Sequence, residues 1–144
     1  MTVSFKTMWK HVVRQSPDRL DRLRKAMTIG RSVLAVVAGV IVAGAVIAVT
    51  EMLIHALADG DAIFSAVGIG YGLGALAGTW LSVKISRARV VGIVVTALLA
   101  VLAVSNLFVI EHPVWFTPLA AVLLAFGWWT GDRFGLSGRR AVDG

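Results

Sequence analysis

Long apolar stretches alternate with short polar segments along this chain. The most continuous stretch runs from Ser32 to Leu57, and Val33 to Val49 within it carry no charge. An α-helix rises about 1.5 Å per residue, so about 20 apolar residues cross the roughly 30 Å hydrocarbon layer of a bilayer. A chain of 144 residues offers too little surface to cover a helix that is apolar on every side. The stretch therefore predicts a transmembrane helix over about residues 32–57.

Three further apolar stretches predict three more spans, over about residues 62–83, 90–110 and 113–131. The start of the last span is open. Pro118 could kink a helix already under way, or Thr117 could cap a helix that begins at Pro118, which would leave His112–Phe116 as an interfacial turn. Short loops favour antiparallel neighbours. The expected fold is all-α: one domain over 32–134 that forms a four-transmembrane-helix antiparallel bundle, followed by a flexible tail over 135–144.

Residues 1–31 precede the first span and are strongly basic. Apolar side chains recur in this arm at helical spacing, namely Phe5, Met8, Trp9 and Val12. Ser16-Pro17-Asp18 has the residues typical of a helix start. We expect two short helices, the first an amphipathic helix lying on the cytoplasmic membrane surface. The alternative is a mobile basic tail.

The composition agrees with a membrane protein, because 58% of the residues are apolar and only 15% are charged. The chain has no cysteine, which excludes disulfides, thiolate catalysis and cysteine metal sites. The N-terminal segment lacks the continuous apolar core of a cleavable signal peptide, so we expect the first span to stay in the mature protein.

Positive charge is distributed unevenly along the chain. All 14 Lys and Arg residues lie in the N-terminal arm, in the turn after the second span or in the C-terminal tail. Positive residues stay on the cytoplasmic side, so both termini should be cytoplasmic in a bacterial inner membrane. Anionic lipid, rather than nucleic acid, is then the partner expected for the basic arm. Tryptophans expected as interfacial anchors are Trp9, Trp80, Trp115, Trp128 and Trp129.

Small residues recur at every fourth position in the first two spans. They are Ala35, Gly39 and Ala43 in the first span, and Gly70, Gly74 and Gly78 in the second. Such stripes let helix backbones approach closely in lipid, either within the chain or between copies in an oligomer. A glycine-rich phosphate loop is a poor alternative, since no strand precedes the glycines and no P-loop lysine follows them.

Polar residues are expected to converge at the outer ends of the helices. Glu51 and His55 lie four apart on one helix face, and Asn106, Glu111 and His112 fall at a similar depth. Three interpretations stay open: interfacial residues in water, a structural bond from Glu51 to Asn106, or a site that binds protons or a divalent metal. Tyr71, at mid-span, needs a hydrogen-bond partner.

The chain resembles a group of small bacterial four-span membrane proteins. The resemblance is carried by LAVVAGVIVAGAVIAVTEMLIH, LGALAGTWLSVKI and NLFVIEHPVWF, covers about residues 32–131 and implies the four-span topology, but no activity. Without a catalytic triad or a haem or flavin motif, we expect neither an enzyme nor a cofactor. Two classes of function stay open for this sequence. One is a structural or accessory subunit or homo-oligomer. The other is a small oligomeric transporter or channel with its polar site at the outer mouth.

Overall fold

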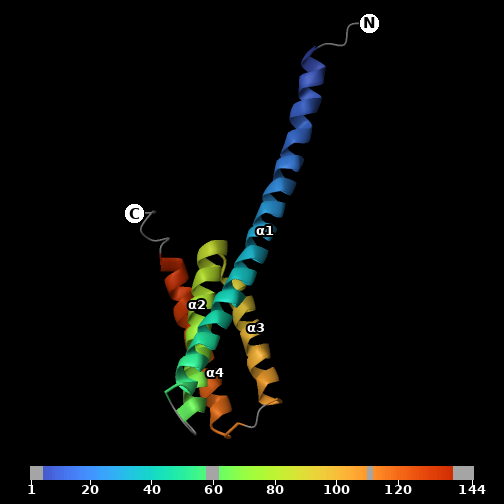
Figure 1. Cartoon of the computed structure of the whole chain (residues 1–144). Coiled ribbons are helices and arrows are strands. Elements are labelled where there is room, and N and C mark those ends of the chain that lie inside the picture. Colours follow the sequence, from blue (N-terminus) through green and yellow to red (C-terminus); the bar gives the residue numbers. More distant parts are fainter. Residues whose placement is uncertain (1–4, 58–61, 110–111, 138–144) are drawn as a thin grey trace. The chain divides into compact units, whose positions relative to one another are not determined.

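The structure is a computed structural model that describes residues 5–57, 62–109 and 112–137, with side chains described from residue 21 onward. It contains four helices, α1 (Phe5–His55), α2 (Ala62–Ser86), α3 (Arg89–Leu107) and α4 (Phe116–Ser137) (Figure 1). No strand occurs in these ranges, so the all-α prediction is confirmed for them. The chain divides into unit 1, residues 1–31, and unit 2, residues 32–144. The Trp9 side chain, Glu111 and residues 138–144 lie outside the description.

The prediction of two short helices in the N-terminal arm is wrong. α1 is continuous from Phe5 to His55 and runs through Ser16-Pro17-Asp18, where a new helix was expected. Proline removes one backbone hydrogen bond and crowds the preceding turn, at a cost of about 3 kcal/mol. The residues on either side of Pro17 are mostly good helix formers, such as Lys, Arg, Leu and Gln, and helix propagation on both sides carries the chain through this defect.

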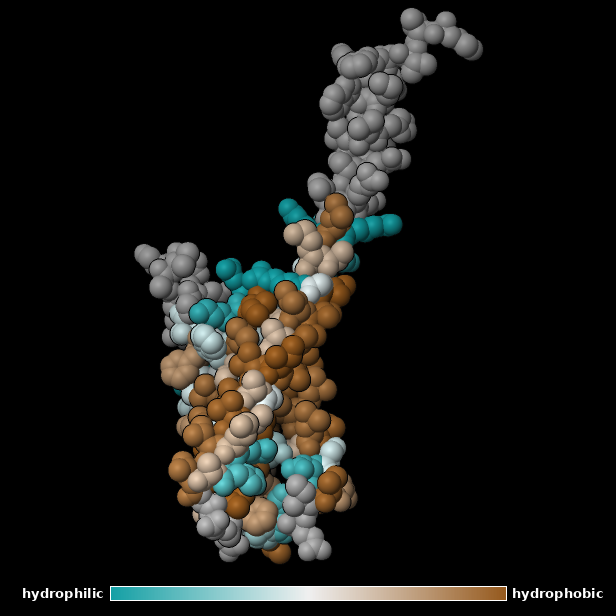
Figure 2. Space-filling model, in the orientation of Figure 1, coloured by the Kyte–Doolittle hydropathy of each residue, from teal (hydrophilic) through white to brown (hydrophobic). Residues whose placement is uncertain are grey.

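Three helical segments are long and apolar enough to cross a membrane, namely Asp21–His55, Ala62–Ser86 and Arg89–Leu107, among the residues described. Their outward side chains are apolar; Leu34, Ile41 and Val101 are each more than half exposed. Hydrophobic residues cover most of the visible face of unit 2, and hydrophilic residues gather toward its two ends (Figure 2). These features indicate a helical membrane protein. α4 is less apolar because its last turns carry Asp132 and Arg133.

Close backbone contact joins α2 to the part of α1 in unit 2. A Cβ added to Gly39 would lie 2.8 Å from the Gly78 carbonyl oxygen, and one added to Gly78 would lie 2.6 Å from the Gly39 carbonyl oxygen. Ala35 and Ala43 on the same face are fully buried. The small-residue faces found in the sequence therefore meet each other inside one chain, and a second copy would have to use a different surface.

A third stripe of small residues, absent from the sequence analysis, joins α4 to α2. Gly127, Gly131 and Gly135 lie four apart, and a Cβ on Gly127 would collide with the carbonyl oxygen of Gly72. Among the pairs formed by α2, α3 and α4, the contact between α2 and α4 is the most extensive. α4 continues to Ser137, so the flexible tail predicted from residue 135 begins too early. Packing of Gly135 against Val83 stabilises helix where the composition favours coil.

The structure also shows where α4 starts. Phe116 N–H donates to the Pro113 carbonyl at 2.9 Å, so residues 113–116 form a turn that leads into the helix. Pro118 lies in the first helical turn, where its missing N–H removes no intrahelical bond, and no kink is required. The helix therefore starts at Phe116, between the two possible starts at residue 113 and at Pro118.

Candidate functional site

The predicted polar convergence forms only in part. Asn106 Nδ2 donates to the Tyr71 hydroxyl at 3.3 Å, which joins α3 to α2. The Glu51 charge, on α1, acts electrostatically on this hydroxyl. Tyr71 is 7% exposed, whereas Glu51 and Asn106 are half-buried. α2 and α3 are thus joined through a phenol and an amide, and Tyr71 makes the bond to Asn106 that one of the three interpretations assigned to Glu51.

His55 and His112 make other contacts in the structure. The His55 ring Nδ1 lies 2.9 Å from the backbone carbonyl oxygen of Glu51, one turn earlier in α1, and the side chain is exposed. His112 stacks on Phe116 with ring centroids 4.6 Å apart and meets Phe64 edge-on. Across the described ranges, no three His, Asp or Glu side chains gather as metal ligands. The group around Tyr71 is therefore suited to hydrogen bonding more than to metal binding.

The opposite end of unit 2 holds an ion pair that sequence reasoning missed. Arg89 Nε lies 3.3 Å from Asp132 Oδ2; the Arg89 side chain is 69% exposed and that of Asp132 only 12%. The second carboxylate oxygen, Oδ1, is buried without a hydrogen-bond partner. The pair ties the start of α3 to the last turns of α4. The only signal in the sequence was a single acid directly after the last apolar stretch.

Arg87 shapes the turn next to this ion pair. Its φ of 59° is in the left-handed region, which ends α2 between Ser86 and Ala88. Ser86 Oγ donates to the Ser82 carbonyl at 2.7 Å and accepts from the Ala88 N–H at 3.2 Å. These bonds fix the direction in which α3 leaves the turn and so the position of Arg89.

The predicted tryptophan anchors fall into two groups. Trp80, Trp115 and Trp129 are each more than a third exposed. Lys84 lies 4.7 Å from the Trp80 ring centroid and Arg133 lies 4.2 Å from that of Trp129, which places cations over aromatic rings at the Arg89 end. Trp128 differs, because its Nε1 is buried and its indole lines a cleft between α3 and α4.

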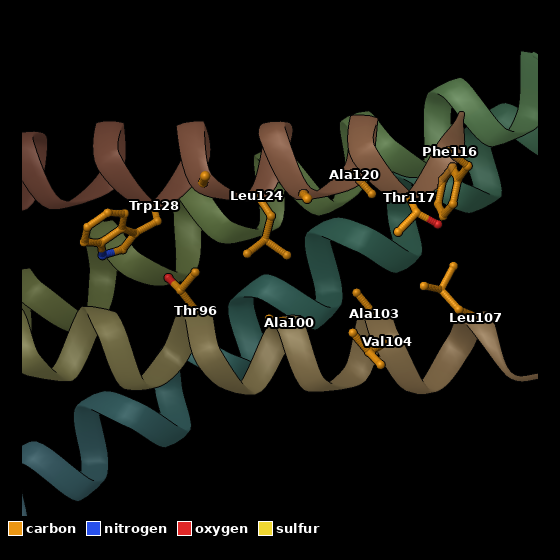
Figure 3. A pocket seen from close by; sticks show the side chains of 12 residues that line it. Thr96, Ala100, Ala103, Val104, Leu107, Phe116, Thr117, Ala120, Leu124 and Trp128 are labelled. Atoms are coloured by element: carbon orange, nitrogen blue, oxygen red, sulfur yellow. The ribbon is translucent and has the colours of Figure 1, made fainter. Parts of the chain in front are cut away.

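This α3–α4 cleft has a volume of about 350 Å³. Its lining is almost entirely apolar and comprises Thr96, Ala100, Ala103, Val104, Leu107, Phe116, Thr117, Ala120, Ala121, Leu124, Ala125 and Trp128. Figure 3 shows the side chains of α3 and α4 projecting toward one another, with Trp128 near one end and Leu107 and Phe116 near the other. The many alanines leave the space between the two helices open.

Comparison of the chain with models of protein families, with curated proteins and with solved structures finds no match.

Proposed function

We propose that this chain is an integral membrane protein that crosses the bilayer four times and acts as a structural or accessory subunit without enzymatic activity or a cofactor. The observation that carries this proposal is the direct backbone contact of α2 with both α1 and α4, at Gly78 and at Gly72. Such contact makes a rigid scaffold. Hydroxyl groups inside it bond to neighbouring helical groups, as Thr79 does to Thr96 at 3.0 Å. A rigid, apolar unit is better suited to holding partners than to moving substrate.

The outward face of α4 supports a fourth span. Val122 is 65% exposed and Phe126 60%, and both are apolar. The 14 residues from Phe116 to Trp129 form a helix about 21 Å long at 1.5 Å per residue. This length is shorter than the hydrocarbon layer, but a bilayer thins, and flanking side chains extend to the interface, at modest cost.

Orientation in a bacterial inner membrane follows from the cations at the Arg89 end. Lys84, Arg87, Arg89 and Arg133 all lie at this end of unit 2, where anionic cytoplasmic lipid headgroups would meet them. Both termini are then cytoplasmic, and the basic arm adjoins the same leaflet. The unit would serve as a subunit of a larger assembly, or as a homo-oligomer through faces other than the glycine stripes.

The natural absence of cysteine makes this topology directly testable. We expect a membrane-impermeant maleimide to label Leu57→Cys in intact cells, because Leu57 is 80% exposed at the end opposite Arg89. Arg87→Cys should react only after the cells are opened. The opposite pattern, or equal labelling of both variants in intact cells, would contradict the proposed orientation.

A transporter or channel is the second candidate, and the Glu51–Tyr71–Asn106 group favours it. Acidic residues within membrane spans often mark proton pathways, and the Glu51 charge acts electrostatically on the buried Tyr71 hydroxyl. The scaffold proposal expects proteoliposomes containing the full chain to pass protons and divalent cations no faster than protein-free vesicles. A flux that is present in the wild type, lost in Glu51→Gln and kept in Met52→Gln would instead establish transport. Met52 is a suitable control because it is adjacent in sequence and 76% exposed.

A further inference from the structure

We infer that the α3–α4 cleft holds one alkyl chain of a membrane phospholipid. The inference rests on the proposed placement of unit 2 in a bilayer and goes beyond the scaffold role, because it assigns a ligand class to a particular cavity. The occupant follows from three features of the cleft: its chemistry, its dimensions and the surface onto which it opens.

The lining presents almost no polar group to an occupant. No charged residue contributes to it, and only two of its side chains, Thr96 and Thr117, carry hydroxyl groups. The Thr96 hydroxyl already donates to the Gly92 carbonyl at 3.0 Å. The Trp128 N–H is shielded from the cleft because Nε1 is buried. Apolar cavities of about 150 Å³ stay free of water and bind small hydrocarbons, and this cleft is larger at about 350 Å³.

The dimensions of the cleft fit a single alkyl chain. Its lining extends from Thr96 to Leu107 on α3 and from Phe116 to Trp128 on α4, about 17 Å at 1.5 Å per residue. This length covers nearly all of the α4 segment from Phe116 to Trp129 that is proposed to cross the bilayer. A volume of about 350 Å³ over this length gives a cross-section of about 20 Å².

A second copy of the chain does not fit the same space. Apolar atoms touch at about 4.0–4.5 Å, so a single file of methylene groups has a cross-section of roughly 15–20 Å². A helix with its side chains is about 10–12 Å wide, which corresponds to roughly 80–110 Å². The cleft therefore matches a lipid chain along its length, whereas a transmembrane helix could place only side chains in it.

The cleft also opens where lipid would be. Val104 on its rim is 52% exposed, and its neighbours Val101 and Val122 are 62% and 65% exposed. Trp128 lines one end of the cleft, and Leu107 and Phe116 line the end near the α3–α4 connection (Figure 3). An alkyl chain would therefore enter the cleft sideways from the lipid around unit 2.

Photocrosslinking of the full-length protein tests this assignment. The chain is reconstituted in phosphatidylcholine vesicles that contain a small fraction of phosphatidylcholine with a diazirine near the end of one acyl chain. After illumination, mass spectrometry of the peptides should find label concentrated on the lining, for example at Ala103, Val104 and Leu124. Ala121→Phe, which places a ring in the cleft, should abolish this label. Ala97→Phe is the matched control and should keep it, because Ala97 is exposed on α3 outside the lining.

Each alternative outcome overturns the inference in a distinguishable way. Label spread over exposed apolar side chains in proportion to their exposure would remove the site and leave the membrane placement intact. No label on unit 2 would remove both. Crosslinks between two copies would replace lipid with a second chain. Ala125→Leu provides a smaller change on the same wall, and retention of the cleft label in both folded Ala121→Phe and folded Ala125→Leu would also contradict the assignment.

Discussion

Replacing Gly127 with valine should cost this protein about 3 kcal/mol of folding free energy or more. A Cβ at this position would collide with the Gly72 carbonyl oxygen and would lie 3.1 Å from the Ala75 Cβ. Overpacking a core costs typically about 1–3 kcal/mol, and the upper end applies when the obstacle is backbone that cannot change rotamer. α4 would have to move away from α2, and the extensive α2–α4 contact would loosen along its length.

Reversible unfolding in mixed detergent micelles measures this loss, and Gly44→Val is the matched control. Gly44 lies in α1 with nothing within 4 Å of a built Cβ, so the same substitution there tests helix propensity without a collision. Gly44→Val should leave stability within about 0.5 kcal/mol of the wild type, as is usual for surface substitutions. Equal destabilisation by both variants would mean that the α2–α4 interface does not depend on backbone contact.

Removing Arg89 should destabilise the protein more than removing the charge of its partner Asp132. The two side chains differ in burial, since that of Arg89 is 69% exposed and that of Asp132 is 12% exposed. Arg89→Gln leaves a buried carboxylate whose Oδ1 has no partner even in the wild type. Breaking a fully buried pair in this way costs about 3–5 kcal/mol, and we expect about 2 kcal/mol here because the pair reaches solvent on one side.

Asp132→Asn leaves only an exposed guanidinium and should cost less than about 1 kcal/mol. The double variant Arg89→Gln/Asp132→Asn should return close to the stability of Asp132→Asn alone, because it no longer buries an unpaired charge. The free energies of unfolding of the wild type and these three variants form a double-mutant cycle. Equal effects of the two single changes, or additivity in the double variant, would show that the ion pair does not hold the start of α3 against α4.

The ion pair also explains how a charged residue is accommodated at the start of α3. The N-terminus of a helix carries partial positive charge, so a cation in the first turn is unfavourable. Arg89 is the first residue of α3, and the Asp132 carboxylate supplied by α4 offsets this repulsion. α4 therefore offsets the unfavourable interaction between Arg89 and the dipole of α3. The ion pair also holds the α2–α3 turn beside the end of α4.

The sequence by itself determined the helical class and the approximate position of each apolar helix. Hydrophobic length is a local property, because a run of apolar residues either does or does not match the thickness of a bilayer. α2 and α3 each begin within one residue of their predicted starts, at Ala62 and Arg89. The small residues at Gly39 and Gly78 were likewise visible, since a period of four can be read from the chain. The scaffold role of the bundle is our proposal and is not contained in this period.

The tertiary structure alone decided which groups meet. Tyr71, rather than Glu51, bonds Asn106, because the rotation of each helix about its axis depends on the packing of all its faces. The Arg89–Asp132 pair joins residues far apart in the chain, and no local period could have linked them. The cleft beside Trp128 exists because alanines of α3 face alanines of α4, and this depends on how the two helices pack. Sequence periodicity locates a helix, whereas the contacts between helices are collective and appear only when the whole bundle is assembled.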